Sequence, residues 1–137
     1  HGFTYSGHPI ACAAALATLD ILERQNFVSR VANDIGPYLQ SKWHELSDHE
    51  IVGHIRGAGM LGSIELVRDK ITNERLEPNQ KAGGICREFC IANNLVMRAV
   101  GDSMIISPPF VCSYEDIDLL IERARKSLDQ TAAYYSV

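Results

Sequence analysis

The fold is decided by residues 51–67, which read IVGHIRGAGMLGSIELV. Branched apolar side chains favour extended strands, and the glycines between them allow a tight turn. The pattern predicts two strands joined by a turn around Gly57 and Gly59. Glycines at such spacing also occur in dinucleotide sites, but those open a helix, whereas the residues after Gly62 are strand-like. We therefore expect a glycine-rich hairpin here.

Two helices are predicted before this hairpin. The first begins at Pro9, with Ser6 or His8 near its cap, and its small and apolar residues predict burial on several sides. The second covers residues 28–46, where apolar side chains recur at three- and four-residue steps. Gly36-Pro37 lies within it, and we expect a kink or break there because proline lacks the helical donor.

After the hairpin, the patterns predict a loop, a helix, two short strands and a closing helix. Asn93 or Asn94 is a plausible left-handed stop, and Ser113 with Asp116 has near capping-box spacing. The predicted bounds are 69–79 for the loop, 80–92 for the helix, 95–100 and 104–106 for the strands, and Ser113 onward for the last helix. The order α-α-β-β-α-β-β-α predicts an α+β fold with helices on one face of a small, mostly antiparallel sheet.

Composition restricts the class of protein. The 137 residues can form one domain, and 46% hydrophobic and 22% charged residues are typical of a globular protein. A net charge of −4 gives no basic surface for nucleic acid or an anionic membrane, and the apolar run near Ile10–Leu19 is too short to span a bilayer. No signal peptide is visible. We therefore expect a cytoplasmic location.

Cys86 and Cys90 are one helical turn apart and could be a pair of metal ligands, but no second Cys or His pair has zinc-ligand spacing, so we expect no metal site. We interpret the thiols as buried and free in a reducing cytosol, and we expect His44 and His49 to be solvated. The four cysteines are Cys12, Cys86, Cys90 and Cys112.

Residues 1–9, HGFTYSGHP, place hydroxyls and glycines just before a helix N-terminus. Thr4 and Ser6 could donate to an anion such as phosphate, and Phe3 and Tyr5 could pack against a ring. The alternative is an ordinary helix start. Because such a loop normally lies inside a larger enzyme, we expect this chain to be the last part of a longer protein.

Arg98 lies in the segment LVMRAVGD, between apolar strand residues and a Gly-Asp turn. Its planar guanidinium could bind a carboxylate with two hydrogen bonds. It could equally be a surface residue or the partner of Asp102.

Taken together, these segments resemble the C-terminal region of the class III pyridoxal-phosphate aminotransferases of fold type I, in particular the ω-amino acid and amine:pyruvate transaminases. The similar segments are HGFTYSGHP with the following helix, IRGAGMLGSIELV, and LVMRAVGDSMIISPPFV. They occur in family order, and the resemblance covers about residues 1–130.

The resemblance implies pyridoxal 5′-phosphate (PLP) as cofactor, and a homodimer in which Thr4 contacts the cofactor phosphate of the neighbouring subunit. Phe3 would line the same pocket, and Arg98 would be the mobile residue that binds the substrate carboxylate. The implied organisation is a phosphate-contact loop and linking helix from the large domain (1–26), the small C-terminal domain (27–130) and a tail (131–137). We expect this tail to be loosely held.

Two departures from the family pattern matter. Ornithine- and GABA-type members carry an arginine three residues before the PP pair, where this chain has Ile105. This departure favours pyruvate over 2-oxoglutarate. The family's Schiff-base lysine also has no equivalent here, so we expect it upstream, assign no catalytic residue, and expect the chain alone to be inactive. The lysines present are Lys42, Lys70, Lys81 and Lys126.

The implied function is transfer of an amino group between an amine or ω-amino acid and a keto acid, with pyruvate favoured. The alternatives are a 2-oxoglutarate-linked class III aminotransferase, an aminomutase, a decarboxylase, or a non-catalytic binding or dimerisation module. Neither nucleic acid nor a membrane is an expected partner.

Overall fold

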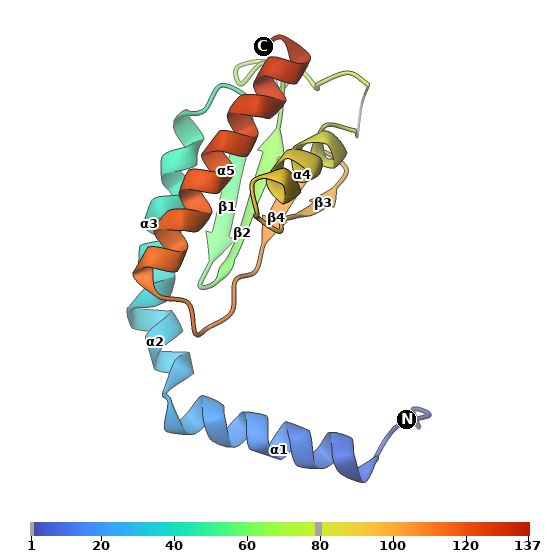
Figure 1. Ribbon diagram of the computed structural model, residues 1–137, viewed down its shortest axis with the longest axis vertical. Helices are drawn as coiled ribbons and strands as arrows, with labels where there is room; N and C mark the ends of the chain where they lie inside the picture. Colours follow the sequence, from blue (N-terminus) through green and yellow to red (C-terminus); the bar gives the residue numbers. More distant parts are fainter. Residues whose placement is uncertain (1, 79–80) are drawn as a thin grey trace.

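A computed structural model describes residues 2–78 and 81–137 of the chain. A four-stranded sheet carries three helices on one face, as predicted, and another helix points away from it (Figure 1). The predicted helix start at Gln80 lies outside the described residues. In chain order the elements are α1 (Pro9–Arg24), α2 (Phe27–Asn33), α3 (Ile35–His44), the 3-10 helix η1 (Glu45–Asp48), β1 (Val52–Ala58), β2 (Leu61–Leu66), α4 (Ala82–Ala92), β3 (Arg98–Val100), β4 (Ser103–Ile106) and α5 (Tyr114–Tyr135).

The sheet is antiparallel throughout, with strand order β1-β2-β4-β3. The predicted hairpin of β1 and β2 is confirmed, and its turn is at Gly59-Met60, where Gly59 adopts a φ of +55°. Gly57 lies within β1 and pairs with Gly62. Pairing of β2 with β4 joins this hairpin to the second one.

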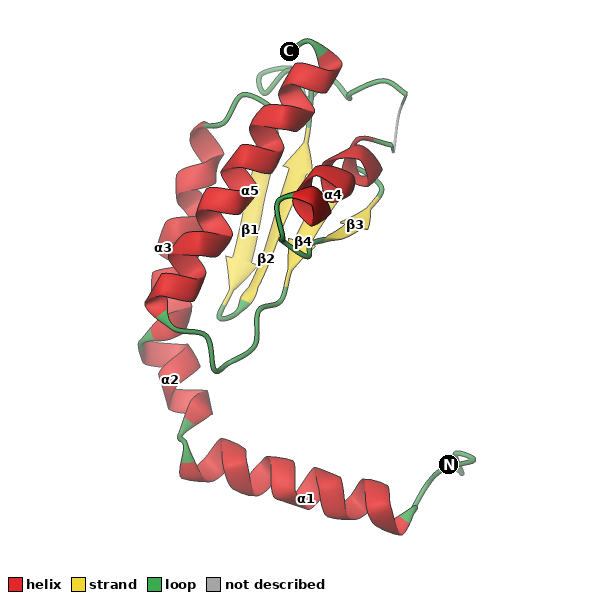
Figure 2. Ribbon diagram, viewed as in Figure 1, coloured by secondary structure: helices red, strands yellow, loops and turns green. Residues whose placement is uncertain are grey.

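One face of the sheet is covered by α3, α4 and α5 (Figure 2). Along β2, Ile64 and Leu66 are buried, whereas the alternating Ser63 and Glu65 are only half-buried. Because successive side chains of a strand point to opposite faces, Ser63 and Glu65 lie on the face without helices. The largest fully buried side chains are Trp43, Ile35, Leu39, Leu46, Ile51, Ile64, Leu66, Leu76, Met104, Ile106, Ile117 and Leu128.

The predicted second helix is divided, but not at Gly36-Pro37. The break is at Asp34, between α2 and α3, where φ is −133° and ψ is −87°. Proline clashes with the carbonyl four residues before it, which for Pro37 is that of Asn33, the last residue of α2. Pro37 itself lies in the first turn of α3, where its missing N–H is not needed. The break therefore precedes the proline instead of coinciding with it.

The last helix begins as predicted but ends later. The Ser113 side chain accepts from the backbone of Asp116, and the Asp116 side chain accepts from the backbone of Ser113, which completes the capping box. The expectation of a loose tail from Thr131 is wrong, because α5 continues to Tyr135 and buries both Thr131 and Ala132. Packing of these residues extends the helix beyond its periodic part.

The predicted burial of the first helix is also not seen. No residue of α1 is buried, and the helix points away from the sheet (Figure 1). Its apolar side chains Ile10, Leu16 and Leu19 are between 56% and 74% exposed. A helix that is apolar on most faces needs surfaces to cover it, and the described residues do not provide them.

Candidate functional site

The turn before α1 is closed by its own hydrogen bonds. Ser6 N donates to the carbonyl of Phe3 at 2.9 Å, and Phe3 N donates to Ser6 Oγ at 3.2 Å. Gly7 has a φ of +73°, which turns the chain toward α1. The hydroxyl of Thr4 has no hydrogen-bond partner among the described residues, and Phe3 is 79% exposed. This turn therefore presents an unused hydroxyl donor beside an aromatic ring.

The start of α1 leaves its backbone donors available. His8 is the N-cap residue, as one of the two predictions had it, but no side chain caps the helix. Ser6, the other predicted cap, uses its hydroxyl within the preceding turn instead. Uncapped N–H groups at a helix start attract anions, which is the property that the sequence predicted for this segment.

Arg98 begins β3, the strand at one edge of the sheet. It lies opposite Ile105 of β4, and Ile105 lies opposite Ser63 of β2. Residues directly opposite on neighbouring strands share a face, so Arg98 lies on the face without helices. Its side chain is exposed, and within the described part of the chain no hydrogen bond or ion pair engages its guanidinium.

Asp102 is not the partner of Arg98. Its carboxylate is buried and accepts from the backbone N of Ala82 at 3.1 Å, and Arg75 Nη1 lies 3.8 Å from Asp102 Oδ2. The predicted alternative that Arg98 pairs with Asp102 is therefore wrong. Arg98 is instead exposed and available to a ligand.

The three predicted site residues are not brought together. Phe3 and Thr4 lie at the far end of α1, and Arg98 lies on the sheet edge (Figure 1). Each therefore presents its functional groups to space that the described residues do not enclose.

The lysines are placed on the surface of the domain and not in an enclosed site. Lys42 Nζ is 3.2 Å from Glu45 Oε1, and this carboxylate raises the pKa of the Lys42 amine. A lysine that attacks a carbonyl needs a lowered pKa, so this environment is the opposite of what nucleophilic chemistry requires. Lys70 Nζ donates to the carbonyls of Ser47 and His49 at 2.6 and 3.3 Å.

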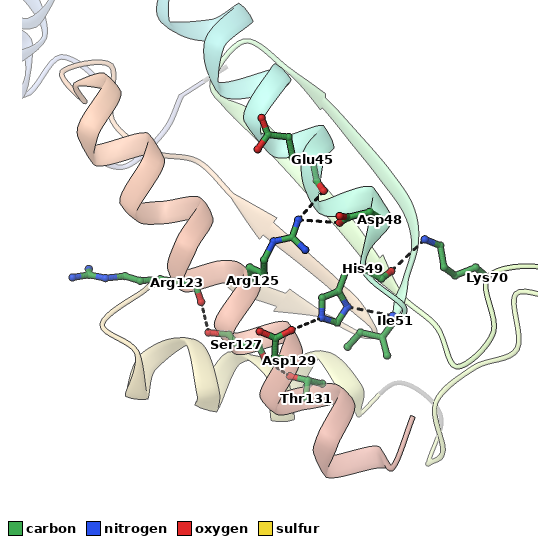
Figure 3. A network of polar contacts seen from close by, with 10 residues as sticks. All are labelled: Glu45, Asp48, His49, Ile51, Lys70, Arg123, Arg125, Ser127, Asp129 and Thr131. Atoms are coloured by element: carbon green, nitrogen blue, oxygen red, sulfur yellow. Dashed lines mark hydrogen bonds and ion pairs between the residues drawn. The ribbon is translucent and has the colours of Figure 1, made fainter.

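A polar network joins the segment between α3 and β1 to α5 (Figure 3). Arg125 Nη2 donates to the carbonyl of Glu45 and to Asp48 Oδ1, both at 2.9 Å, and lowers the pKa of Asp48. His49 is only 7% exposed, so the expectation that it is solvated is wrong. Its Nε2 lies 3.1 Å from Asp129 Oδ1, and its Nδ1 accepts from Ile51 N. This network supports the fold and lies apart from Arg98.

The cysteines are free, and only two are buried. Cys86 and Cys90 lie on α4, on its side toward α5, and a hydrogen bond with Cys90 together with burial raises the pKa of the Cys86 thiol. The expected burial is therefore confirmed for this pair but is wrong for Cys12, which is exposed on α1.

Among residues 2–78 and 81–137, no three His, Cys, Asp or Glu side chains gather as a metal ion would require. Nor does any helix in these ranges combine the length and apolar character needed to cross a bilayer.

Residues 1–128 match the protein family described as aminotransferase class-III. The putrescine–pyruvate aminotransferase of Pseudomonas aeruginosa is 53% identical over 133 residues, which are 97% of this chain and 29% of that protein. Gamma aminobutyrate transaminase 1, mitochondrial, of Solanum lycopersicum is 40% identical over 131 residues, which are 96% and 25% of the two chains.

Solved structures agree with these matches. The omega transaminase from Pseudomonas jessenii in complex with PMP superimposes with a TM-score of 0.91 at 32% identity, over 99% of this chain and 30% of that one. A structure described as a transaminase with L-ala gives a TM-score of 0.90 at 35% identity, over 98% and 31%. The chain thus spans less than a third of the length of these relatives.

Proposed function

The chain belongs to the class-III aminotransferases, and from that premise we propose that the whole protein is a PLP-dependent aminotransferase. It would move an amino group between an amine or ω-amino acid and a keto acid, with pyruvate as the favoured acceptor. Since the chain covers 29% of its 53% identical relative, its residues would supply only part of the active site. By themselves they would not catalyse the reaction, because the lysine that holds the cofactor in the family has no counterpart here.

The observation that carries this proposal is the environment of Arg98. An exposed guanidinium on an edge strand, with no partner among residues 2–78 and 81–137, is free to bind and release a carboxylate. In this role Arg98 would hold the carboxylate of an amino or keto acid with paired charged hydrogen bonds, and would move aside for a plain amine. Charged hydrogen bonds of this kind contribute about 1.5–3 kcal/mol each.

Ile105 supports pyruvate as the acceptor. It is the cross-strand neighbour of Arg98, at the position where ornithine- and GABA-type members of the family carry an arginine. With isoleucine there, the site would offer a single cation from these two strands, which suits a single carboxylate. The relative named putrescine–pyruvate aminotransferase also favours this acceptor, and it favours a diamine as the donor.

The turn before α1 fits one end of the cofactor. The unused hydroxyl of Thr4 and the uncapped start of α1 are donors that a phosphate accepts, and Phe3 would line the same pocket. In the homodimer we propose, these residues would reach the cofactor of the neighbouring subunit. When bound, PLP supplies an electron sink for the carbon from which the amino group leaves. The part played by this chain is to bind the phosphate and to orient the carboxylate.

The domain organisation follows from the same proposal. Residues 1–26 would be the phosphate-contact loop and linking helix of the large domain, and 27–130 the small domain. The exposed apolar side chains of α1 support this, because the large domain would cover them. The last residues, 131–137, would belong to the small domain, since α5 includes most of them. A cytoplasmic location remains a prediction from the sequence.

Two assays on the whole protein test the proposal. With PLP, we expect a visible absorption band from the bound cofactor and transfer from an amine to pyruvate that is faster than transfer to 2-oxoglutarate. A preference for 2-oxoglutarate would favour the alternative to which the relative diaminobutyrate–2-oxoglutarate transaminase points. Absence of both the band and the transfer would leave a non-catalytic module.

Arg98→Ala tests whether Arg98 binds the substrate carboxylate. It should lower kcat/KM for L-alanine by about 10²-fold, as expected for the loss of about 3 kcal/mol of charged hydrogen bonding, and change a plain amine little. Arg87→Gln, at an exposed residue of α4, is the matched control and should change neither. Equal losses for both donors would remove Arg98 from carboxylate recognition.

A further inference from the structure

The turn between β3 and β4 contains a carboxylate that is wholly shielded from solvent. The side chain of Asp102 is 0% exposed, and its Oδ1 accepts from Ala82 N, the first residue of α4. The start of a helix carries partial positive charge, which favours an anion at this position. Arg75 supplies a full positive charge, with its Nη1 3.8 Å from Asp102 Oδ2.

The backbone of the same turn is held from two further sides. Leu66 N, at the end of β2, donates to the carbonyl of Asp102 at 2.9 Å. On the other side, α4 packs so closely that a Cβ on Gly83 would lie 2.2 Å from the carbonyl oxygen of Gly101. Gly101 itself has a φ of +57°. The turn is therefore fixed to α4 and to β2.

Arg75 is in turn held by the sheet. Its Nη2 lies 2.7 Å from Glu65 Oε1, a half-buried carboxylate on the face without helices. Arg75 thus connects Glu65 of β2 with Asp102 of the β3–β4 turn. This connection joins the two hairpins, and its Glu65 end lies on the face to which Arg98 belongs.

The edge strand depends on this turn for its position. β3 is three residues long and pairs only with β4, through Arg98, Ala99 and Val100. Arg98 is its first residue, three positions before Gly101, and within the described residues no hydrogen bond or ion pair holds its guanidinium. The position of the strand therefore depends on its pairing with β4 and on the Gly101-Asp102 turn at its other end.

We propose that Asp102, together with Arg75, is a positioning residue that sets the place from which Arg98 binds the substrate carboxylate. The proposal rests on the function proposed above, in that Arg98 is the carboxylate-binding group. Asp102 is buried in the turn and would act through the strand. Binding groups lose effectiveness when they are displaced by as little as 1 Å, so release of this turn should weaken carboxylate recognition selectively.

The test uses Asp102→Asn in the whole, PLP-loaded protein. Asparagine keeps the shape and the oxygen that accepts from Ala82, but removes the charge that faces Arg75. We expect the KM for L-alanine to rise about tenfold, with kcat and the KM for a plain amine such as butylamine changed less than about twofold. The Kd of propionate, an unreactive carboxylate measured by calorimetry, should rise in parallel with the KM for alanine.

A second variant and a control keep the test independent of folding. Arg75 is 45% exposed, so Arg75→Gln should fold and should show the same selective effect, whereas Arg87→Gln on α4 should show none. Thermal unfolding of each variant reports stability separately. Equal loss with alanine and butylamine, or unchanged propionate binding in both variants, would overturn the positioning role. If the wild-type protein transfers no amino group, the proposed function is wrong. The role of Asp102 can still be judged in that case, by comparing the Kd of propionate for the wild type with the Kd for each variant.

Discussion

A single glycine, Gly62, lets the first hairpin pack closely against α3. A Cβ on Gly62 would be 2.7 Å from Trp43 Nε1 and 2.9 Å from Ile106 Cγ1, so only glycine fits there. The indole of Trp43 is completely buried and lies in the middle of the core. Gly62, which the sequence shows as one of several closely spaced glycines, is thus a packing residue within β2.

Gly62→Ala should destabilise the fold by about 1–3 kcal/mol, because the added methyl group must displace a buried ring in a packed core. Gly84→Ala is the matched control, since a Cβ at Gly84 in α4 would meet nothing within 4 Å. This control should stabilise the helix by about 0.5–1 kcal/mol. Urea denaturation of the two variants gives both values, and a neutral Gly62→Ala would contradict the packing role.

The candidate site could be predicted residue by residue only in part. The surroundings of Thr4 and Arg98 in the chain predict both as site residues, and in the described part of the chain neither side chain has a hydrogen-bond partner. What they bind remains a proposal. The connection of Asp102 to Arg75 could not be predicted, because the two residues are 27 positions apart and meet only when the two hairpins pair. His49 was misjudged for the same reason, since its partner Asp129 lies 80 residues away.

At the scale of elements, local chemistry predicted starts and turns better than ends. The capping box of α5 and the left-handed Asn94 after α4, with a φ of +57°, are confirmed because each depends on a few adjacent residues. The end of α5 was missed because tertiary burial of Ala132 extends the helix. The strand containing Arg98 is shorter than the predicted 95–100, since only its last three residues pair with β4.

The capping box of α5 should make stability depend on pH. Ser113 donates from its backbone N and its hydroxyl to Asp116 Oδ2, at 2.9 and 3.0 Å, which lowers the pKa of Asp116. A carboxyl whose pKa is lower in the folded state stabilises the fold above its unfolded pKa, about 3.9, and loses this effect as the pH falls through the folded value.

Asp116→Asn should therefore be less stable than the wild type at neutral pH, and the difference should shrink as the pH falls below about 4. Denaturant midpoints measured across this range give the comparison. Glu115→Gln, next in the chain but outside the capping box, controls for the loss of one negative charge at the same helix start. A difference between wild type and Asp116→Asn that stays constant with pH would show that the lowered pKa does not contribute.

In the molecule as a whole, the sheet with its three helices is packed around a core, whereas α1 is not. The sheet, α3, α4 and α5 share one continuous core, whereas α1 buries none of its residues. The burial predicted for α1 from its apolar character is wrong for the described residues, which leave its apolar side chains exposed. A groove of about 410 Å³ between α2, α3 and the hairpin turn, lined by Phe27, Val31, Pro37 and Phe110, adds to the exposed apolar surface.

Limited trypsin digestion tests the boundary proposed between residues 26 and 27. Arg24, the last residue of α1, is the first trypsin site in the chain, and the next is Arg30, whose guanidinium donates to the carbonyls of Phe110 and Cys112. We expect cleavage after Arg24 to precede cleavage after Arg30. The remaining fragment should unfold at the same denaturant concentration as the 137-residue chain. Cleavage at both sites at one rate, or a lower midpoint, would place α1 within the domain.

The contacts of α2 and α3 with α5 and with the segment before it join parts that are far apart in the sequence, which bears on the order of folding. Arg30 bonds to Phe110 and Cys112, and Tyr38 to Asp118, across 80 or 82 residues of chain. The two hairpins close over short loops, whereas these contacts can form only after the loop of about 80 residues between them has closed. We therefore expect α5 to dock late in folding. Weakening these contacts should then speed unfolding far more than it slows folding, so that the lifetime of the native state depends on contacts that take no part in binding.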